Sequence, residues 1–523
     1  MRHDHRGSLI GSDLTRRDVF ALAALGLVAG MPRSSFAAGP QEQLTWGIHV
    51  SLAPTWFDPA ETPGLITPFM VLYALHDAMV KPMPGQPLAP SLAQSWSASE
   101  DGLSYDFALR EGATFHNGDP VTAEDVKFSF ERYRGTSHDL MKDRVAAVET
   151  PDADHVRFQL KAPWPDFRTF YATATGAGWI VPKKYVEKVG EDGFKKAPIG
   201  AGPYKFVSFT PGVELVLEAF DQYWRKPPGV KRLVFKSIPE ETTRLAALQR
   251  GEVDIVYSIR GELAEELRRT PGLTLKPVLS PAAFWVYYAD QWDPKSPWYD
   301  ERVRRAGSLA IDREAMNDAI TLGYSKVTGS IIPYTFEFFW QPPLPTYDPD
   351  KAKQLLAEAG HPSGFDAGEF FCDSSYSNVA EALLDNFQAV GVRTKLRPLE
   401  RAAFIEAYAH KKLKNLILGG SGAFGNAATR LETYVVKGGA YVYGSYPDID
   451  ALYQQQAAEL NRKKRSEILD KMQQILAERT VYAPIWQLGF INGAGPRVGE
   501  SGFGLIQDFA YTGPFEDITL KGS

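Results

Sequence analysis

"PSLAQSWSASEDGLSYDFALREGATFHNGDPVTAEDVKFSFER", residues 90–132, carries the strongest structural signals in this chain of 523 residues. Within it Tyr105, Phe107 and Leu109 alternate with polar or smaller residues, which is typical of a strand with one buried face. An Asn-Gly pair follows at 117–118, and this pair tolerates the positive φ angles of a tight turn better than most others. The pattern therefore predicts a strand followed by a turn.

A helix is predicted directly after this turn. Thr122 stands three residues before Asp125, which is the spacing of an N-cap with a short acid variant of the capping box. The apolar residues that follow have the spacing of one helical face: Val126, Phe130 and Tyr133. His116 raises the alternative of a metal or acid/base site, but a zinc site needs several converging ligands and no second histidine stands at ligand spacing. We interpret the stretch as architecture rather than chemistry.

The composition is that of an ordinary globular protein. With 44% hydrophobic and 23% charged residues the chain can bury a large core, and its length predicts two or three structural units. The formal charge of -6 and the pI near 5.9 provide no basic surface for neutralising phosphates. We therefore expect no nucleic acid partner.

The N-terminus has the pattern of an export signal. Arg16 and Arg17 precede an apolar run at 19–31, and small residues follow up to Ala37. Such a run is too short to span a membrane and is typical of a cleaved signal, although a buried helix of the mature fold is the alternative. The twin arginines favour the twin-arginine type of signal. We expect residues 1–37 to be removed and the mature protein to lie in the periplasm.

Several other kinds of site are disfavoured. Cys372 is the one cysteine, so no internal disulfide is possible, and no histidine nearby would activate it. The segments after the signal contain no apolar run long enough to cross a bilayer. We expect no metal and no cofactor, because the histidines beyond the signal are dispersed at 49, 76, 116, 138, 155, 361 and 410.

Residues 90–132 resemble the peptide/nickel-type extracellular solute-binding proteins, family 5, of bacterial ABC importers. The resemblance continues in order through "FDPA" (57–60), "APIGAGPYKFVSF" (197–209), "RLAALQRGEVDIV" (244–256), "VRRAGSLAIDREAM" (303–316) and "YDPDKAKQLLAEAGHPSGFD" (347–366). These blocks span nearly the whole mature chain. The chain is therefore identified from its sequence as a member of this family.

Strands that alternate with helical patterns predict an α/β fold. The resemblance implies the two-lobed periplasmic-binding-protein fold, type II, cluster C, with an extra subdomain inserted in lobe I. Mapped onto this chain, lobe I comprises residues 41–56, 198–279 and 486–523, the inserted subdomain comprises 57–197, and lobe II comprises 280–485. Hinges are expected at 279–285 and 482–486.

The resemblance also implies a function. A family member captures a solute between its lobes and hands it to the permease subunits of an ABC importer in the inner membrane, without acting as an enzyme. We expect a monomer that binds a peptide-like or other small polar organic solute. Hinge closure favours the solute-bound state, because the closed form gains contacts from both lobes.

The family places solute contacts at the turn before the "DPA" block, at both hinges and in a lobe II loop at 419–430. We add two tyrosines from the aromatic segment that follows the loop. The ligand-binding residues expected on this basis are Thr55, Trp56, Phe284, Trp285, Phe424, Asn426, Arg430, Tyr441, Tyr443 and Trp486. For each aromatic residue, anchoring of a lobe edge is an equally weighted alternative.

The lobe II loop departs from the dipeptide-binding members of the family. Those members carry an aspartate there that pairs with the free ammonium of the peptide. Here Ala423 or Phe424 stands at that place, and no acid follows until Glu432. A buried ammonium without a partner is costly, so a simple dipeptide is disfavoured. Asn426 or Arg430 would meet a carbonyl, a hydroxyl or an anion, as in members that import opines, glutathione or sugar-linked solutes.

A serine hydrolase is the alternative from a different class. "GGSGA" at 419–423 nearly matches the G-x-S-x-G nucleophile elbow, with Ala423 in place of the last glycine. The sequence offers no identifiable histidine and acid partners for Ser421. We therefore expect no catalytic residues.

Overall fold

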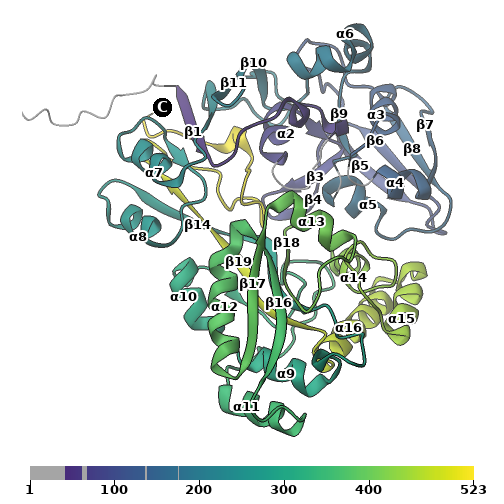
Figure 1. Cartoon of the computed structure of the whole chain (residues 1–523). Coiled ribbons are helices and arrows are strands. Elements are labelled where there is room, and N and C mark those ends of the chain that lie inside the picture. Colours follow the sequence, from purple (N-terminus) through teal and green to yellow (C-terminus); the bar gives the residue numbers. More distant parts are fainter. Residues whose placement is uncertain (1–41, 62–67, 136–137, 175, 523) are drawn as a thin grey trace, which may run out of the picture.

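The computed structural model describes residues 42–61, 68–135, 138–174 and 176–522. They form two lobes, each built on part of one long mixed sheet, and an antiparallel subdomain beside lobe I (Figure 1). The predicted export signal, residues 1–37, lies outside the described part of the chain. Within the described ranges, none of the helices combines the length and the apolar character that a bilayer crossing requires.

Lobe I contains one half of the long sheet. Strand β1 is hydrogen bonded between β12 and β13 and runs parallel to both, while β11 pairs antiparallel with β12 and β10 pairs antiparallel with β11. A central parallel strand is covered on both faces, and β1 is accordingly buried along almost its whole length. The elements of this lobe are β1 (Gln43–Ile48), η1 (Pro54–Phe57), η2 (Pro59–Glu61), α2 (Phe69–Leu75), β10 (Tyr204–Thr210), β11 (Glu214–Ala219), β12 (Arg232–Ser237), α7 (Glu241–Gln249), β13 (Ile255–Val256), α8 (Gly261–Arg269) and η6 (Phe515–Asp517).

Lobe II contains the other half of the sheet. Strand β16 is parallel to β17 and to β18, and β18 pairs antiparallel with β14. Its elements are η4 (Pro297–Tyr299), α9 (Glu301–Leu309), α10 (Arg313–Thr321), β15 (Lys326–Val327), α11 (Pro349–Glu358), β16 (Phe365–Asp373), η5 (Ser374–Tyr376), α12 (Ser377–Ala389), β17 (Val392–Leu399), α13 (Arg401–Ala409), β18 (Leu416–Ser421), α14 (Ala427–Tyr434), α15 (Pro447–Ala458) and α16 (Arg462–Glu478). Buried side chains pack on both faces of this half of the sheet.

Two long strands belong to both lobes. Strands β14 (Thr274–Tyr288) and β19 (Tyr482–Ala494) pair antiparallel from one lobe into the other. The register of this pair shifts between Leu279 and Ala283, within the predicted hinge at 279–285. Since the strands are continuous, the limits that we assign to the lobes stay a prediction.

The inserted subdomain is a four-stranded antiparallel sheet covered by helices, in the strand order β5-β6-β8-β7. Its elements, with the short strands that join it to lobe I, are β2 (Asp77–Ala78), β3 (Val80–Met83), β4 (Gln86–Pro90), β5 (Ala93–Ala98), β6 (Ser104–Leu109), α3 (Ala123–Glu131), α4 (His138–Arg144), β7 (Val145–Glu149), β8 (His155–Leu160), α5 (Phe167–Thr169), η3 (Phe170–Ala174), β9 (Trp179–Ile180) and α6 (Lys183–Lys196). Helix α2, although it lies within 57–197, packs entirely in the core of lobe I.

The predicted strand, turn and helix of residues 90–132 are confirmed. Tyr105, Phe107 and Leu109 are the buried residues of β6. Thr122 and Asp125 form the capping box at the start of α3, where the Thr122 N–H donates to the Asp125 carboxylate at 2.9 Å. The helix begins where the sequence predicts because this box satisfies backbone groups that the first turn leaves without partners.

His116 joins this subdomain to the "IGAGPY" block. The Gly200 N–H donates to Nδ1 at 3.2 Å, so Nε2 carries the proton and donates to the Gly202 carbonyl at 3.0 Å. Both ring nitrogens are thus engaged with backbone groups. Burial lowers the pKa of His116 to about 3, which keeps the ring neutral near pH 7. Its role is structural, in keeping with our interpretation of the stretch.

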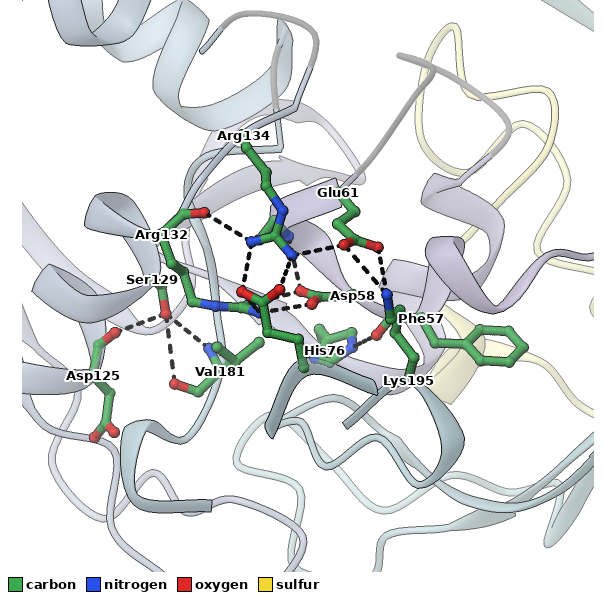
Figure 2. Close-up of polar contacts among 12 residues, drawn as sticks. Phe57, Asp58, Glu61, His76, Asp125, Ser129, Arg132, Arg134, Val181 and Lys195 are labelled. Atoms are coloured by element: carbon green, nitrogen blue, oxygen red, sulfur yellow. Dashed lines mark hydrogen bonds and ion pairs between the residues drawn. The ribbon is translucent and has the colours of Figure 1, made fainter. Parts of the chain in front are cut away.

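A second link joins the "FDPA" block to the end of α3. Arg132 donates two hydrogen bonds of 2.7 Å to the carboxylate of Asp58, which is buried (Figure 2). Next to this pair, Arg134 bridges Glu61 and Glu191 with hydrogen bonds of 2.6 to 2.8 Å (Figure 2). Blocks of sequence that are far apart are therefore tied together by charge-assisted bonds, which fix the subdomain on lobe I.

Candidate functional site

The carboxyl ends of the parallel strands of both lobes meet at the boundary between the lobes. In lobe I the chain leaves β1 at His49 and β13 at Tyr257. In lobe II it leaves β16 into η5, and α13 begins at Arg401 shortly after β17. The two sets touch where Arg260 Nη1 donates to the Ser375 carbonyl at 3.4 Å. Open α/β sheets bind ligands at such strand ends, so this boundary is the candidate site.

Arg244 fixes the lobe I side of the boundary. Its buried guanidinium donates to the carbonyls of Tyr257 and Ile238 at 2.6 and 2.7 Å, and also to those of Pro239 and Ser258. Since these carbonyls follow β12 and β13, one side chain holds both strand ends in place. The segment that leads to Arg260 is therefore preorganised.

An aromatic group lies beside these strand ends. The ring of His49 stacks on that of Tyr511 with centroids 5.3 Å apart, and the Tyr257 hydroxyl donates to the Tyr511 carbonyl. His49 Nδ1 is buried and has no hydrogen-bond partner among the residues that the structure describes. Burial, with the charges of Arg244 and Arg260, lowers the pKa of His49 to about 3. This histidine is therefore a neutral polar group at the boundary.

Arg401 is the main cation on the lobe II side. Its Nη1 donates to the Asp373 carboxylate at 2.8 Å, and its guanidinium also hydrogen bonds to Tyr376. The Arg401 side chain is nevertheless 60% exposed. Burial raises the pKa of Tyr511, whereas the charges of Arg401 and Arg260 act to lower it, so this tyrosine lies within the electrostatic range of a cation from each lobe.

The loop between β18 and α14 reaches across to lobe I and the inserted subdomain. Phe424 stacks on Phe509, with centroids 4.0 Å apart and planes 11° apart. Asn426 caps α14 through Thr429, and its Nδ2 donates to Asp166 at 2.6 Å. One short loop thus makes both an apolar and a polar contact with the other side.

Arg430 holds this loop in shape. Its guanidinium donates to the carbonyls of Ser421 and Ala423 at 3.0 and 3.1 Å, and the residue is buried. The guanidinium also lies 5.4 Å from the ring centroid of Phe336. Arg430 therefore serves the loop itself in this conformation.

Asp166 of the inserted subdomain forms a buried ion pair with Arg465 of α16. Arg465 also donates to Gln456 at 2.9 Å and lies over the ring of Phe338. A buried pair is favourable only when its remaining groups are satisfied, and here Asn426 and Gln456 satisfy them. This cluster joins the inserted subdomain to lobe II away from the hinge strands.

The ten predicted ligand-binding residues fall into separate groups. Phe424, Asn426 and Arg430 lie in or beside the crossing loop. Thr55 and Trp56 lie in η1 of lobe I, where Trp56 packs against the core. The contacts of all these residues with a solute stay a prediction.

The hinge aromatics are core residues of lobe II in this conformation. Phe284 and Trp285 are neighbours in β14, so their side chains lie on opposite faces of the sheet. Trp486 pairs with Phe284 on β19, and both tryptophans are 0% exposed. In this conformation these three aromatic residues therefore anchor the lobe, which is the alternative to solute contact that the sequence leaves open.

The two tyrosines form an aromatic group next to Arg401. Tyr441 stacks on Tyr434 at 5.1 Å and interacts electrostatically with Arg401. Tyr443 lies edge-on to Tyr287 at 5.6 Å, and its hydroxyl meets the backbone of Leu413. Both residues are half-buried.

The Gly-Gly pair before Ser421 serves packing. A Cβ at Gly419 would lie 2.4 Å from Trp285 Nε1, so glycine is needed for the close approach. The Ser421 hydroxyl accepts from the Ala423 N–H at 3.3 Å and interacts with Tyr434. In the part of the chain that the structure describes, no histidine is hydrogen bonded to Ser421, and no cluster of His, Cys, Asp or Glu could hold a metal.

Sequence reasoning missed several residues of the boundary: His49, Arg260, Asp166, Arg401 and Arg465. His49 and Arg260 follow the short strands "QLTWGI" and "IV", so strand ends were the available signal. Asp166 and Arg465 carry no such signal, because 299 positions separate them.

Comparison with known proteins agrees with this fold. Residues 87–441 match the family model for bacterial extracellular solute-binding proteins, family 5 Middle. The chain is similar to heme-binding protein A of Haemophilus influenzae, with 27% identity over 76% of this chain and 78% of that protein. It is also similar to di/tripeptide-binding protein 2 of Pseudomonas aeruginosa, with 28% identity over 72% and 75%.

The structure is similar to that of NikA from Brucella suis in complex with Fe(III)-EDTA. The TM-score is 0.80 and the identity 23%, over 92% of this chain and 100% of that one. Members of the family are solute-binding components of transport systems and are not enzymes. Since the family model covers most of the sequence, the chain belongs to the bacterial extracellular solute-binding proteins, family 5.

Proposed function

We propose that this protein is the periplasmic solute-binding component of an ABC importer, which captures a solute between its lobes and delivers it to permease subunits in the inner membrane. The observation that carries the proposal is that Arg260, which follows β13 of lobe I, donates to Ser375, which follows β16 of lobe II, so that carboxyl ends of parallel strands of both lobes meet. A twin-arginine export signal at residues 1–37 and a monomeric state are parts of the same proposal.

The mechanism follows from the contacts at the boundary. Phe424 on Phe509 and Asp166 with Arg465 join the lobes only when they are closed, while β14 and β19 connect them in every state. A solute that contacts both lobes binds the closed form more tightly and shifts the population toward it by that difference in affinity. The closed form is what a permease distinguishes from the empty, open one.

The solute is a peptide-like or other small polar organic molecule without a free ammonium at the crossing loop. Ala423 or Phe424 stands at the place of the ammonium-binding aspartate of dipeptide-binding members, and the ring of Phe424 lies against those of Phe69 and Phe509. An ammonium there would lose water without gaining a counter-charge. Relatives named for heme and for di- and tripeptides are consistent with different solutes on one scaffold.

The proposal is tested with the mature protein purified from the periplasm. Native mass spectrometry is expected to detect a co-purified small molecule, and adding that molecule back to stripped protein is expected to raise the melting temperature. The molecule must be recovered unchanged after incubation. Recovery of a hydrolysed product, abolished by Ser421→Ala, would contradict the proposal, as would a protein that retains and binds no solute.

A further inference from the structure

We infer that an oxyanion group of the solute, a carboxylate or a phosphate, is bound between Arg260 of lobe I and Arg401 of lobe II. The inference rests on the proposed function and specifies the class of solute. Three features carry it: the unused hydrogen-bonding capacity of Arg260, the exposure of Arg401, and a polar atom of His49 that has no partner.

Arg260 extends from lobe I to the boundary. Its backbone N–H donates to the Glu241 carboxylate, and among the described residues its guanidinium makes one long hydrogen bond, from Nη1 to the Ser375 carbonyl at 3.4 Å. A guanidinium has five N–H donors, and the side chain is exposed. Most of the donor capacity of Arg260 is therefore open to an acceptor from solution.

Arg401 comes from lobe II at the first residue of α13. Asp373 and Tyr376 are its side-chain partners among the described residues. Asp373 compensates part of the charge and holds the guanidinium in one place, yet 60% of the side chain stays exposed. Asp373 therefore orients the guanidinium of Arg401 but leaves some of its N–H donors available to a ligand.

His49 supplies the third feature. Its buried Nδ1 finds no partner in the described part of the chain, and a buried polar atom without a partner costs free energy that a ligand can recover. The ring is neutral and stacks on Tyr511, which interacts electrostatically with both arginines. With its proton on Nδ1, His49 donates to a solute oxygen next to the two cations.

The position of the arginines on opposite lobes couples this contact to closure. An oxyanion that accepts from both guanidinium groups makes its full set of hydrogen bonds only in the closed form. Each hydrogen bond between the oxyanion and a guanidinium is expected to strengthen binding about tenfold or more. The same contact therefore selects an acidic solute and favours the state that holds it.

The test uses the purified protein, with citrate and inorganic phosphate as separate probes against sodium chloride of equal ionic strength. Melting temperature is measured for the wild type, for Arg260→Gln and for Arg401→Gln. Two control variants remove surface arginines that pair with neighbouring acids, Arg250→Gln in lobe I and Arg302→Gln in lobe II. At least one probe is expected to raise the melting temperature of the wild type and of both controls.

The two test variants are expected to lose this rise, with about tenfold weaker binding of the probe. A rise with citrate alone assigns a carboxylate, and a rise with phosphate alone assigns a phosphate. The inference is wrong if neither probe acts on the wild type, or if Arg260→Gln and Arg401→Gln respond as it does. Recovery of an uncharged solute would overturn the inference alone, whereas a chain that captures no solute would overturn the proposed function.

Discussion

Phe424 of lobe II and Phe509 of lobe I stack with their ring centroids 4.0 Å apart, nearly parallel. Phe424 belongs to the core of lobe I by its contacts, although it lies on a loop of lobe II. The loop is fixed by Arg430, so Phe424 can leave Phe509 only when the lobes separate. The contact between Phe424 and Phe509 is therefore present in the closed form and lost in the open form.

Replacing Phe424 by alanine is expected to open the protein. Loss of a buried phenylalanine costs about 3–5 kcal/mol, and because this ring is buried only across the boundary, the cost falls on the closed form. Small-angle X-ray scattering of the unliganded protein is expected to show a larger radius of gyration. Phe206→Ala, which removes a ring packed within lobe I alone, is the control and is expected to leave the radius unchanged. An unchanged radius for Phe424→Ala would exclude this role.

Asp166→Asn is expected to weaken closure at a second point. The substitution leaves Arg465 buried without a counter-charge, which costs about 3–5 kcal/mol for a buried pair. The open form exposes Arg465 to water and escapes this cost, so the closed population falls. Affinity for the co-purified solute, measured by calorimetry, is expected to drop at least about tenfold.

The control for Asp166→Asn is Asp152→Asn, on the surface of the same subdomain. The double variant Asp166→Asn with Arg465→Gln removes the orphaned charge and is expected to recover part of the affinity. Equal affinities for the wild type and Asp166→Asn would show that the pair has no part in closure.

Trp285→Ala is expected to act on stability first. The indole is fully buried in lobe II between Tyr434 and Tyr482, and its removal is expected to lower the free energy of unfolding by about 3–5 kcal/mol. Urea unfolding measures this change. A variant of normal stability that binds solute weakly would instead place Trp285 in contact with the solute, as the family resemblance implies.

Much of the architecture could be predicted because its signals are local. Thr122 and Asp125 stand three residues apart at the start of one helix, and Tyr105 and Phe107 stand two residues apart in one strand. Patterns of this kind depend on the backbone geometry of a few residues. The two-lobed fold was predicted by a different route. Blocks of sequence that resemble the family occur in the same order over nearly the whole chain.

The interlobe contacts could not be predicted in this way. Asp166 meets Arg465 only in the folded protein, where β14 and β19 connect the two lobes, and neither residue belongs to a local sequence pattern. Trp285 and Trp486 were predicted as solute contacts because they lie near the hinges. Both side chains are instead buried in the hydrophobic clusters of lobe II, on the two faces of its sheet. Position in the sequence does not specify the face of a strand that meets a ligand.

Stability is expected to fall as the pH is lowered, and His116 is expected to contribute. The unfolded histidine takes up a proton below about pH 6.5, whereas the folded ring, whose pKa burial lowers to about 3, does not. The unfolded state thus binds more protons throughout this window, and the free energy of unfolding decreases as the pH falls through it. Between pH 7 and pH 5 the contribution of His116 is about 2 kcal/mol.

The measurement compares urea unfolding at pH 7 and pH 5 for the wild type, His116→Asn and His155→Asn. Asparagine can accept from the Gly200 N–H and donate to the Gly202 carbonyl, as His116 does, but it does not titrate. His116→Asn is therefore expected to lose about 2 kcal/mol less than the wild type on acidification. His155→Asn removes an exposed histidine of the same subdomain and is expected to behave like the wild type. The same acid-induced loss in all three proteins would show that His116 takes up its proton in the folded state as readily as in the unfolded chain.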